Sequence, residues 1–168
     1  FQRLIEIWSN IPFLYMVIIV FSVIPSTFSI PTRIAILLIV MVLFSWTGMT
    51  YYMRTETYKE KSRDYTAAAK VIGASNSRII FKHILPNIAA PIIVISAANF
   101  AASILIESGL SFLGIGAQPP IPSWGGIVKD HYSYLLLGKP YLAVLPGMAI
   151  STLVMAFVLT GNALRDAL

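Results

Sequence analysis

The chain has 168 residues, of which 57% are hydrophobic and only 11% charged, with a mean hydropathy of +0.79. Soluble domains carry about 25% charged residues, so this composition excludes a water-facing globular surface and indicates that lipid is the main solvent. The net charge of +5 does not indicate nucleic-acid binding, because the basic residues lie at the ends of apolar runs, as in membrane topology.

Four apolar runs are long enough to cross a membrane, whose hydrocarbon core of about 30 Å takes roughly 20 helical residues. They cover approximately residues 4–24, 32–52, 87–110 and 141–164. Pro12 interrupts the first run and should kink or restart its helix. The alternation typical of barrel strands is absent, and helices are the remaining structure that satisfies the backbone in a bilayer. We therefore predict a single all-α transmembrane domain over residues 1–168.

Two non-spanning segments, 54–86 and 111–140, separate these runs, and the positive charges orient them. Three of the Lys and Arg residues lie on the side of the second segment: Arg33, Lys129 and Lys139. The other nine lie on the side of the first segment: Arg3, Arg54, Lys59, Lys61, Arg63, Lys70, Arg78, Lys82 and Arg165. This asymmetry predicts a cytoplasmic 54–86 loop and an extracytoplasmic 111–140 loop, the latter rich in Gly and Pro and expected to form an ordered loop with short turns. Because the sequence begins at Phe1 rather than Met, we also expect further helices upstream.

The sequence argues against catalysis in this chain. Its only histidines, His83 and His131, are predicted on opposite sides of the membrane, so neither can pair with the other for hydrolysis or metal binding. There is no cysteine, and Gly138-Lys139 is followed by Pro140, which breaks the phosphate-loop pattern. We therefore expect no enzyme activity, metal or cofactor here, and any ATP hydrolysis on separate subunits.

The 54–86 segment carries the most informative local pattern. Three small residues at 67–69 precede Gly73, which suits the end of a short helix, and Ser75 can cap a second one. Pro86 marks the entry into the next span. The small side chains would allow another protein to approach closely. An amphipathic connector lying on lipid headgroups explains the same pattern equally well.

This segment resembles the "EAA" loop of ABC importer permeases, in which Glu-Ala-Ala is followed by Gly and then by Leu-Pro about twelve residues on. The downstream run Ser-Phe-Leu-Gly-Ile-Gly-Ala-Gln-Pro-Pro at 111–120, with Pro-Ser-Trp-Gly at 122–125, is similar to the second permease of dipeptide, oligopeptide and nickel importers. The ending Gly-Asn-Ala-Leu-Arg-Asp-Ala-Leu at 161–168 is similar as well. The likeness covers nearly the whole chain.

The resemblance implies a type I ABC importer permease in a bacterial or archaeal plasma membrane, partnered by ATPase subunits, a second permease and an extracytoplasmic substrate-binding protein. It also implies that the 54–86 loop docks on the ATPase through a set of coupling residues: Asp64, Ala67, Ala68, Ala69, Gly73, Ala74, Ser75, Leu85 and Pro86. The motif's Glu is replaced by Ala67, so the usual acidic contact must come from elsewhere, with Asp64 and Glu60 the nearby acids. The start of the chain, Gln2–Ser9 with Pro12, looks closer to the oligopeptide branch than to the nickel branch.

The third run carries a polar stripe that predicts part of a translocation path. Ser96, Asn99, Ser103 and Glu107 are spaced three, four and four residues apart and fall within about 80° on one helical face. Such stripes line wet cavities or bond to other helices. Two roles stay open for Glu107: an interfacial charge, or a group that gates the path or contacts a substrate amine. The alanines at 97, 98, 101 and 102 are expected to pack against a sister subunit.

Two other functions compete with an importer permease. A self-sufficient secondary transporter or channel would need more intramembrane ionisable groups than Glu107. An intramembrane hydrolase is disfavoured by the isolated histidines. The 111–140 segment fits two compatible roles, a contact for the substrate-binding protein and a rigid cap over the pore mouth.

Overall fold

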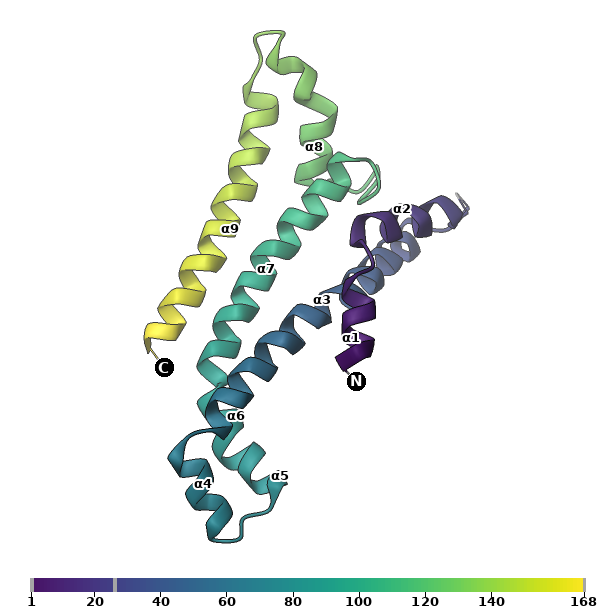
Figure 1. The fold of residues 1–168 in the computed structure, drawn as a ribbon. Helices are drawn as coiled ribbons and strands as arrows, with labels where there is room; N and C mark the ends of the chain where they lie inside the picture. Colours follow the sequence, from purple (N-terminus) through teal and green to yellow (C-terminus); the bar gives the residue numbers. More distant parts are fainter. Residues whose placement is uncertain (1, 26, 168) are drawn as a thin grey trace.

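The computed structural model describes residues 2–25 and 27–167, and these residues are mostly helical, with no strand among them. The predicted domain, 1–168, therefore includes three residues, at positions 1, 26 and 168, that lie outside the described part. The helices form an elongated bundle, with the 54–86 segment at one end and the 111–140 segment at the other (Figure 1).

The first apolar run is divided into two helices, α1 (Gln2–Ser9) and α2 (Phe13–Val23), that are bent by 71° relative to each other. Pro12 stands at the N-cap of α2 with an extended backbone, so the expected restart at this proline is confirmed. Trp8 at the end of α1 donates its indole N–H to the carbonyl of Leu43 at 2.8 Å, which ties α1 to the next helix.

The longest helix, α3 (Ile30–Lys61), has 32 residues and is therefore about 48 Å long at about 1.5 Å per residue. Pro31 lies in its first turn, where its missing N–H costs nothing. The helix runs nine residues past Tyr52, so the charged stretch after the apolar run extends the same rod. Val17, Leu37, Val40 and Leu110 form a buried cluster that joins α3 to α2 and to α7.

Helices α7 (Ala89–Phe112) and α9 (Tyr141–Ala167) lie side by side along most of their length (Figure 1). Gly161 makes this approach possible, because a Cβ on it would lie 2.7 Å from the Cβ of Ala97. The rings of Phe100 and Phe157 stack beside this point at 5.6 Å. The expectation that Ala97 faces a sister subunit is therefore wrong: this alanine packs inside the chain.

The 111–140 segment contains more helix than expected from its Gly and Pro content. Helix α8 (Trp124–His131) starts at Ser123, whose Oγ accepts the N–H of Gly126 at 3.0 Å, and leads into the 3-10 turn η2 (Tyr132–Leu135). Gly125 packs directly on α7, since a Cβ there would lie 1.9 Å from the carbonyl oxygen of Ser108. A cap and this tertiary contact thus form a helix that the glycines disfavour locally.

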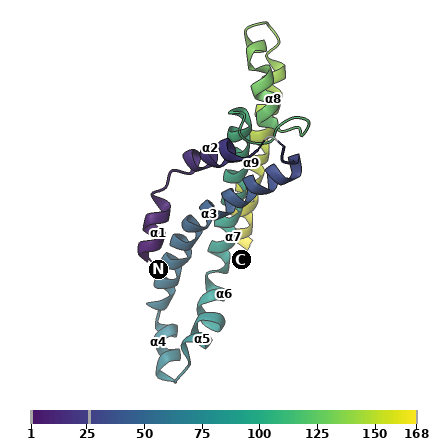
Figure 2. The same ribbon diagram turned by 90° about the vertical axis from the view of Figure 1, so that its right-hand side faces the viewer.

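Three described helices, α3, α7 and α9, are long and apolar enough to cross a membrane, and α1 with α2 would make a fourth if the bent pair is one span. Only 6% to 17% of the apolar stretch of each long helix is buried inside the chain. Figure 2 shows the same helices edge-on, with α1 beside the lower part of α3 and α2 beside its upper part. The uncovered apolar faces require lipid or other membrane subunits around them.

Candidate functional site

After α3 ends at Lys61, the 54–86 segment continues with helix α4 (Asp64–Val71), which stops two residues before Gly73. Gly73 has a φ of +86°, a conformation that is strained for residues with a side chain. The N–H of Gly73 bonds to the carbonyl of Lys70 and that of Ala74 to the carbonyl of Ala69, both at 3.0 Å. These two bonds are a Schellman motif, so the predicted helix break at Gly73 is confirmed.

The chain returns toward the bundle through α5 (Asn76–Ile79), the π-helical turn η1 (Ile80–Ile84) and α6 (Leu85–Asn87). Ser75 caps α5 as predicted, with its Oγ accepting the N–H of Arg78 at 3.3 Å. Leu85 and Pro86 occupy α6, one residue before the break at Ile88 that precedes α7.

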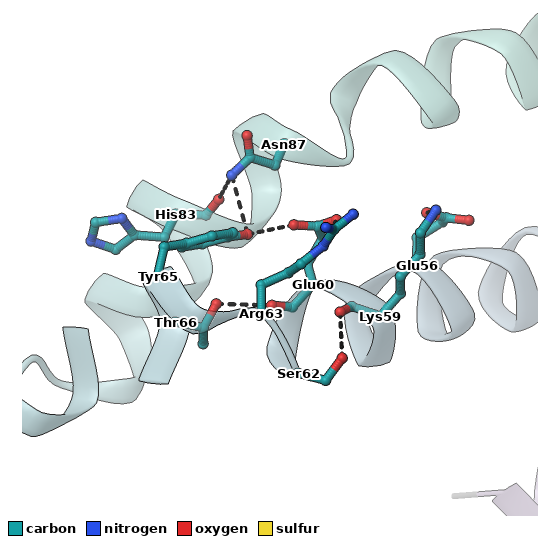
Figure 3. Close-up of polar contacts among 9 residues, drawn as sticks. All are labelled: Glu56, Lys59, Glu60, Ser62, Arg63, Tyr65, Thr66, His83 and Asn87. Carbon is teal, nitrogen blue, oxygen red and sulfur yellow. Dashed lines mark hydrogen bonds and ion pairs between the residues drawn. The ribbon is translucent and has the colours of Figure 1, made fainter. Parts of the chain in front are cut away.

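A hydrogen-bond network anchors this segment at both of its ends (Figure 3). The Tyr65 hydroxyl donates to the Glu60 carboxylate at 2.6 Å and accepts from the Asn87 amide at 3.1 Å. Asn87 also donates to the His83 carbonyl at 2.7 Å, and Thr66 donates to the Glu60 carbonyl at 2.9 Å. One tyrosine on α4 therefore connects the end of α3 with α6, directly before α7.

The far end of the segment is an exposed apolar turn. Val71 and Ile72 are 87% and 85% exposed, and Ala67 and Ala68 are also exposed, while Ala69 and Ala74 pack on a small core of Ile79, Ile84 and Ile88. Two adjacent exposed β-branched side chains thus form a small apolar surface at the tip of a charged loop.

The two acids near Ala67 differ in their availability. Glu60 is held by Tyr65 and lies 3.7 Å from the Arg63 guanidinium. Asp64 is exposed in the first turn of α4 and has no hydrogen bond or ion pair with the described residues. Of the two acids, Asp64 is the one free to make an external contact.

The polar stripe of α7 makes local hydrogen bonds and borders two cavities. Ser96 and Ser103 donate to backbone carbonyls one turn back, at 2.7 and 2.8 Å, and Asn99 is exposed. Ser103 lines a cavity of about 550 Å³ between α1, α3 and α7, which Ser45 and Thr47 also line.

Glu107, at the C-terminal end of the stripe, lines a second cavity of about 470 Å³, which Trp124 also lines. Its Oε1 accepts the hydroxyl of Ser111 at 2.6 Å, and the Ser111 Oγ accepts the N–H of Ala117 at 3.0 Å. Ser111 is only 1% exposed. The loop between α7 and α8 thereby fixes one oxygen of the Glu107 carboxylate through Ala117 and Ser111. Leu38 lines both cavities, so they adjoin along α3.

Sequence reasoning gave no role to Tyr65, Asn87 or Ser111, which hold the two sites in place. Tyr65 and Glu60 are five residues apart across a helix break, so no helical periodicity relates them. A partial signal existed for Ser111, which is four residues after Glu107 and therefore on the same helical face. Among the described residues, no group of three His, Asp or Glu side chains is placed to hold a metal ion.

Fold and site together define a multi-pass helical membrane protein with an anchored polar loop at one end. All 168 residues match the model of one family, the binding-protein-dependent transport system inner membrane component. The chain belongs to this family, whose fold is the helical bundle of ABC permeases. The members of this family are inner-membrane components of transport systems.

Curated relatives support the same assignment. The glutathione transport system permease protein GsiD of Salmonella paratyphi A is 34% identical over 167 residues, covering 99% of this chain and 53% of the relative. The oligopeptide transport system permease protein OppC is 32% identical over 99% of this chain, in both Haemophilus influenzae (51% of the relative) and Escherichia coli K12 (53%). The chain thus spans about half the length of the curated relatives it matches.

Proposed function

We propose that this chain is a permease subunit of an ATP-driven ABC importer for peptides or peptide-like substrates. Two permeases would enclose a path that opens alternately to each side, with ATPase subunits below and a substrate-binding protein above. The family membership and the relatives' names, which concern glutathione and oligopeptides, support this proposal. It places the 54–86 loop in the cytoplasm and the 111–140 loop outside.

The observation that carries the coupling role is the anchored loop with an exposed apolar tip. Docking of Val71, Ile72 and the neighbouring alanines on an ATPase would bury side chains that are now in water. The Tyr65 hydrogen bonds to Glu60 and Asn87 would pass a displacement of α4 to α3 and α7 together. Asp64 would supply the acidic contact that Ala67 lacks. The set Asp64, Ala67, Ala68, Ala69, Gly73, Ala74, Ser75, Leu85 and Pro86 forms the proposed coupling site.

The stripe Ser96, Asn99, Ser103 and Glu107 is the proposed wall of the translocation path. Its support is that Ser103 and Glu107 line two adjoining cavities. Peptide substrates carry an ammonium group, and a carboxylate with one oxygen already fixed by Ser111 is a preorganised partner for it. We therefore assign Glu107 to substrate contact in preference to a purely interfacial role.

Co-purification tests the proposal directly. The full-length protein, gently extracted from its native membrane, should carry a stoichiometric ATPase and a second permease, identified by mass spectrometry. Recovery of the protein alone from several mild detergents would instead support a self-sufficient transporter. Uptake that persists after removal of cellular ATP, with the membrane potential intact, would support that rival as well.

A further inference from the structure

A groove of about 610 Å³ lies between the lower end of α3 and the helices α4 and α5. Three basic residues from two of these helices line it: Arg54, Lys61 and Lys70. Thr57 and Asn76 add a hydroxyl and an amide, and no Asp or Glu is among the described residues that line it. The groove therefore concentrates positive charge without an internal counter-charge.

Neighbouring cations behave differently. Lys59 and Arg63 lie 3.6 and 3.7 Å from Glu56 and Glu60 respectively. Arg54, Lys61 and Lys70 form no ion pair with the described carboxylates. Arg54 donates to the Tyr58 hydroxyl at 3.3 Å and its guanidinium lies 5.3 Å from the centre of the Tyr58 ring, contacts that leave its positive charge without a counter-charge. Because unpaired like charges repel one another, their convergence on one groove indicates an anionic ligand.

The position of the groove indicates an amphiphile. Arg54 directly follows the apolar part of α3, and Lys61 lies about 10 Å further along the same helix at about 1.5 Å per residue. The headgroup layer of a bilayer is about 5–8 Å deep on each side. Ile80 and Ile84 give the groove an apolar wall on the segment that leads back to α7. Cations and an apolar wall thus meet at the predicted membrane boundary.

We propose that this groove binds an anionic phospholipid of the cytoplasmic leaflet. The lipid phosphate lies among Arg54, Lys61 and Lys70, and an acyl chain runs along Ile80 and Ile84. Basic pockets at the cytoplasmic ends of membrane helices are suited to such headgroups. The proposal rests on the cytoplasmic placement of the loop in the proposed function. An acidic surface of a partner protein is the alternative occupant. Ala67 of the proposed coupling site also lines the groove, but Val71 and Ile72, the most exposed apolar side chains of the 54–86 loop, lie outside it.

The test is native mass spectrometry of the assembled full-length transporter, after equilibration with vesicles of phosphatidylcholine containing some phosphatidylglycerol. The unmodified transporter should retain phosphatidylglycerol in preference to phosphatidylcholine. Each cation near an anionic surface contributes roughly fivefold to binding, so R54Q/K61Q/K70Q should bind phosphatidylglycerol on the order of 100-fold more weakly. Lys82→Gln removes an exposed cation of the same loop outside the groove and should retain the lipid normally.

Two outcomes would overturn the proposal. One is equal retention of both lipids by the unmodified transporter, which does not depend on any variant folding. The other is zero-length cross-linking of Lys61 or Lys70 to carboxylates of a co-purified protein, without selective lipid retention. The lipid measurement does not require transport. Loss of ATPase association would therefore contradict the proposed function, while the retention of lipid could still be interpreted.

Discussion

At the scale of single residues, the hydroxyl of Tyr65 is the group that joins the ends of three helices. It donates to Glu60 at the end of α3 and accepts from Asn87 in α6, while its ring lies beside that of His83 at 6.4 Å. A hydrogen bond to a charged group contributes about 1.5–3 kcal/mol. The bond between Tyr65 and the Glu60 carboxylate is thus the strongest single link described between the loop and α3.

Tyr65→Phe should therefore weaken the mechanical coupling of α4 to α3 and α6 while the loop keeps its fold. The phenyl ring keeps its packing, but both hydrogen bonds are lost. We expect uptake to fall about tenfold, as for a loss of about 1.4 kcal/mol, while the reconstituted transporter still hydrolyses ATP. Parallel measurement of uptake and hydrolysis checks this. Tyr52→Phe, whose hydroxyl bonds to none of the described residues, is the matched control. Equal loss of both activities would mean that the hydroxyl only stabilises the fold.

At Glu107, the effect of the negative charge on uptake can be tested separately from the effect of side-chain shape. Glu107→Gln keeps the side chain's size and an oxygen that can accept the Ser111 hydroxyl, but it removes the negative charge. If the carboxylate contacts a substrate ammonium, uptake of peptides with a free N-terminus should fall about tenfold or more, since a charge-assisted bond is worth roughly twice a neutral one. Uptake of the same peptides with an acetylated N-terminus should be unchanged. Unchanged uptake of both kinds would support the purely interfacial role.

At the scale of elements, helix ends are where sequence reasoning succeeded. Pro12, Gly73 and Ser75 each fix a local backbone conformation or an orphan N–H group, so their effects depend on neighbouring residues alone. Helix α8 was not predicted because the contact that stabilises it, between Gly125 and Ser108, involves another helix. The Ala97–Gly161 contact was missed for the same reason, because tertiary packing brings its partners together. The Ser111–Ala117 bond was missed because it depends on the turn that follows α7.

The conformation of the Gly73 turn can be tested by substitution. No other atom lies within 4 Å of a Cβ built on this residue, so substitutions there test the backbone conformation and not space within the chain. Gly73→Val should cost about 1–2 kcal/mol or more in the positive-φ conformation, whereas Gly73→Asn adopts it more readily. The valine variant should insert normally but lose most uptake and ATPase association, and the asparagine variant should keep most of both. Normal uptake by the valine variant would contradict a coupling role for this turn.

At the scale of the whole molecule, the two polar ends differ in construction. The 54–86 end is basic and tied to α3 and α6 by hydrogen bonds, whereas the opposite end is a helical hairpin whose tip is apolar. Leu136 is 93% exposed there, and Leu135 and Leu137 are exposed beside it. Composition, charge asymmetry and local motifs predicted the fold class, and the family match agrees with it. They did not predict this tip, because apolar residues in a loop carry no periodicity that distinguishes a buried position from an exposed one.

Under the proposed orientation the hairpin tip faces the substrate-binding protein, and its leucines provide an apolar anchor for that contact. Leu136→Asp would place a charge in the contact, and a central apolar anchor is worth about 2 kcal/mol or more. We therefore expect at least tenfold weaker binding of the transporter's own binding protein, measured by titration against proteoliposomes. Uptake should recover when the binding protein is in excess, because the path and the coupling loop are untouched.

Ser133→Asp, an exposed site on the same turn, adds the same charge without removing an anchor and should bind nearly normally. Unchanged affinity in Leu136→Asp, together with loss of the second permease on purification, would assign the tip to the permease pair instead.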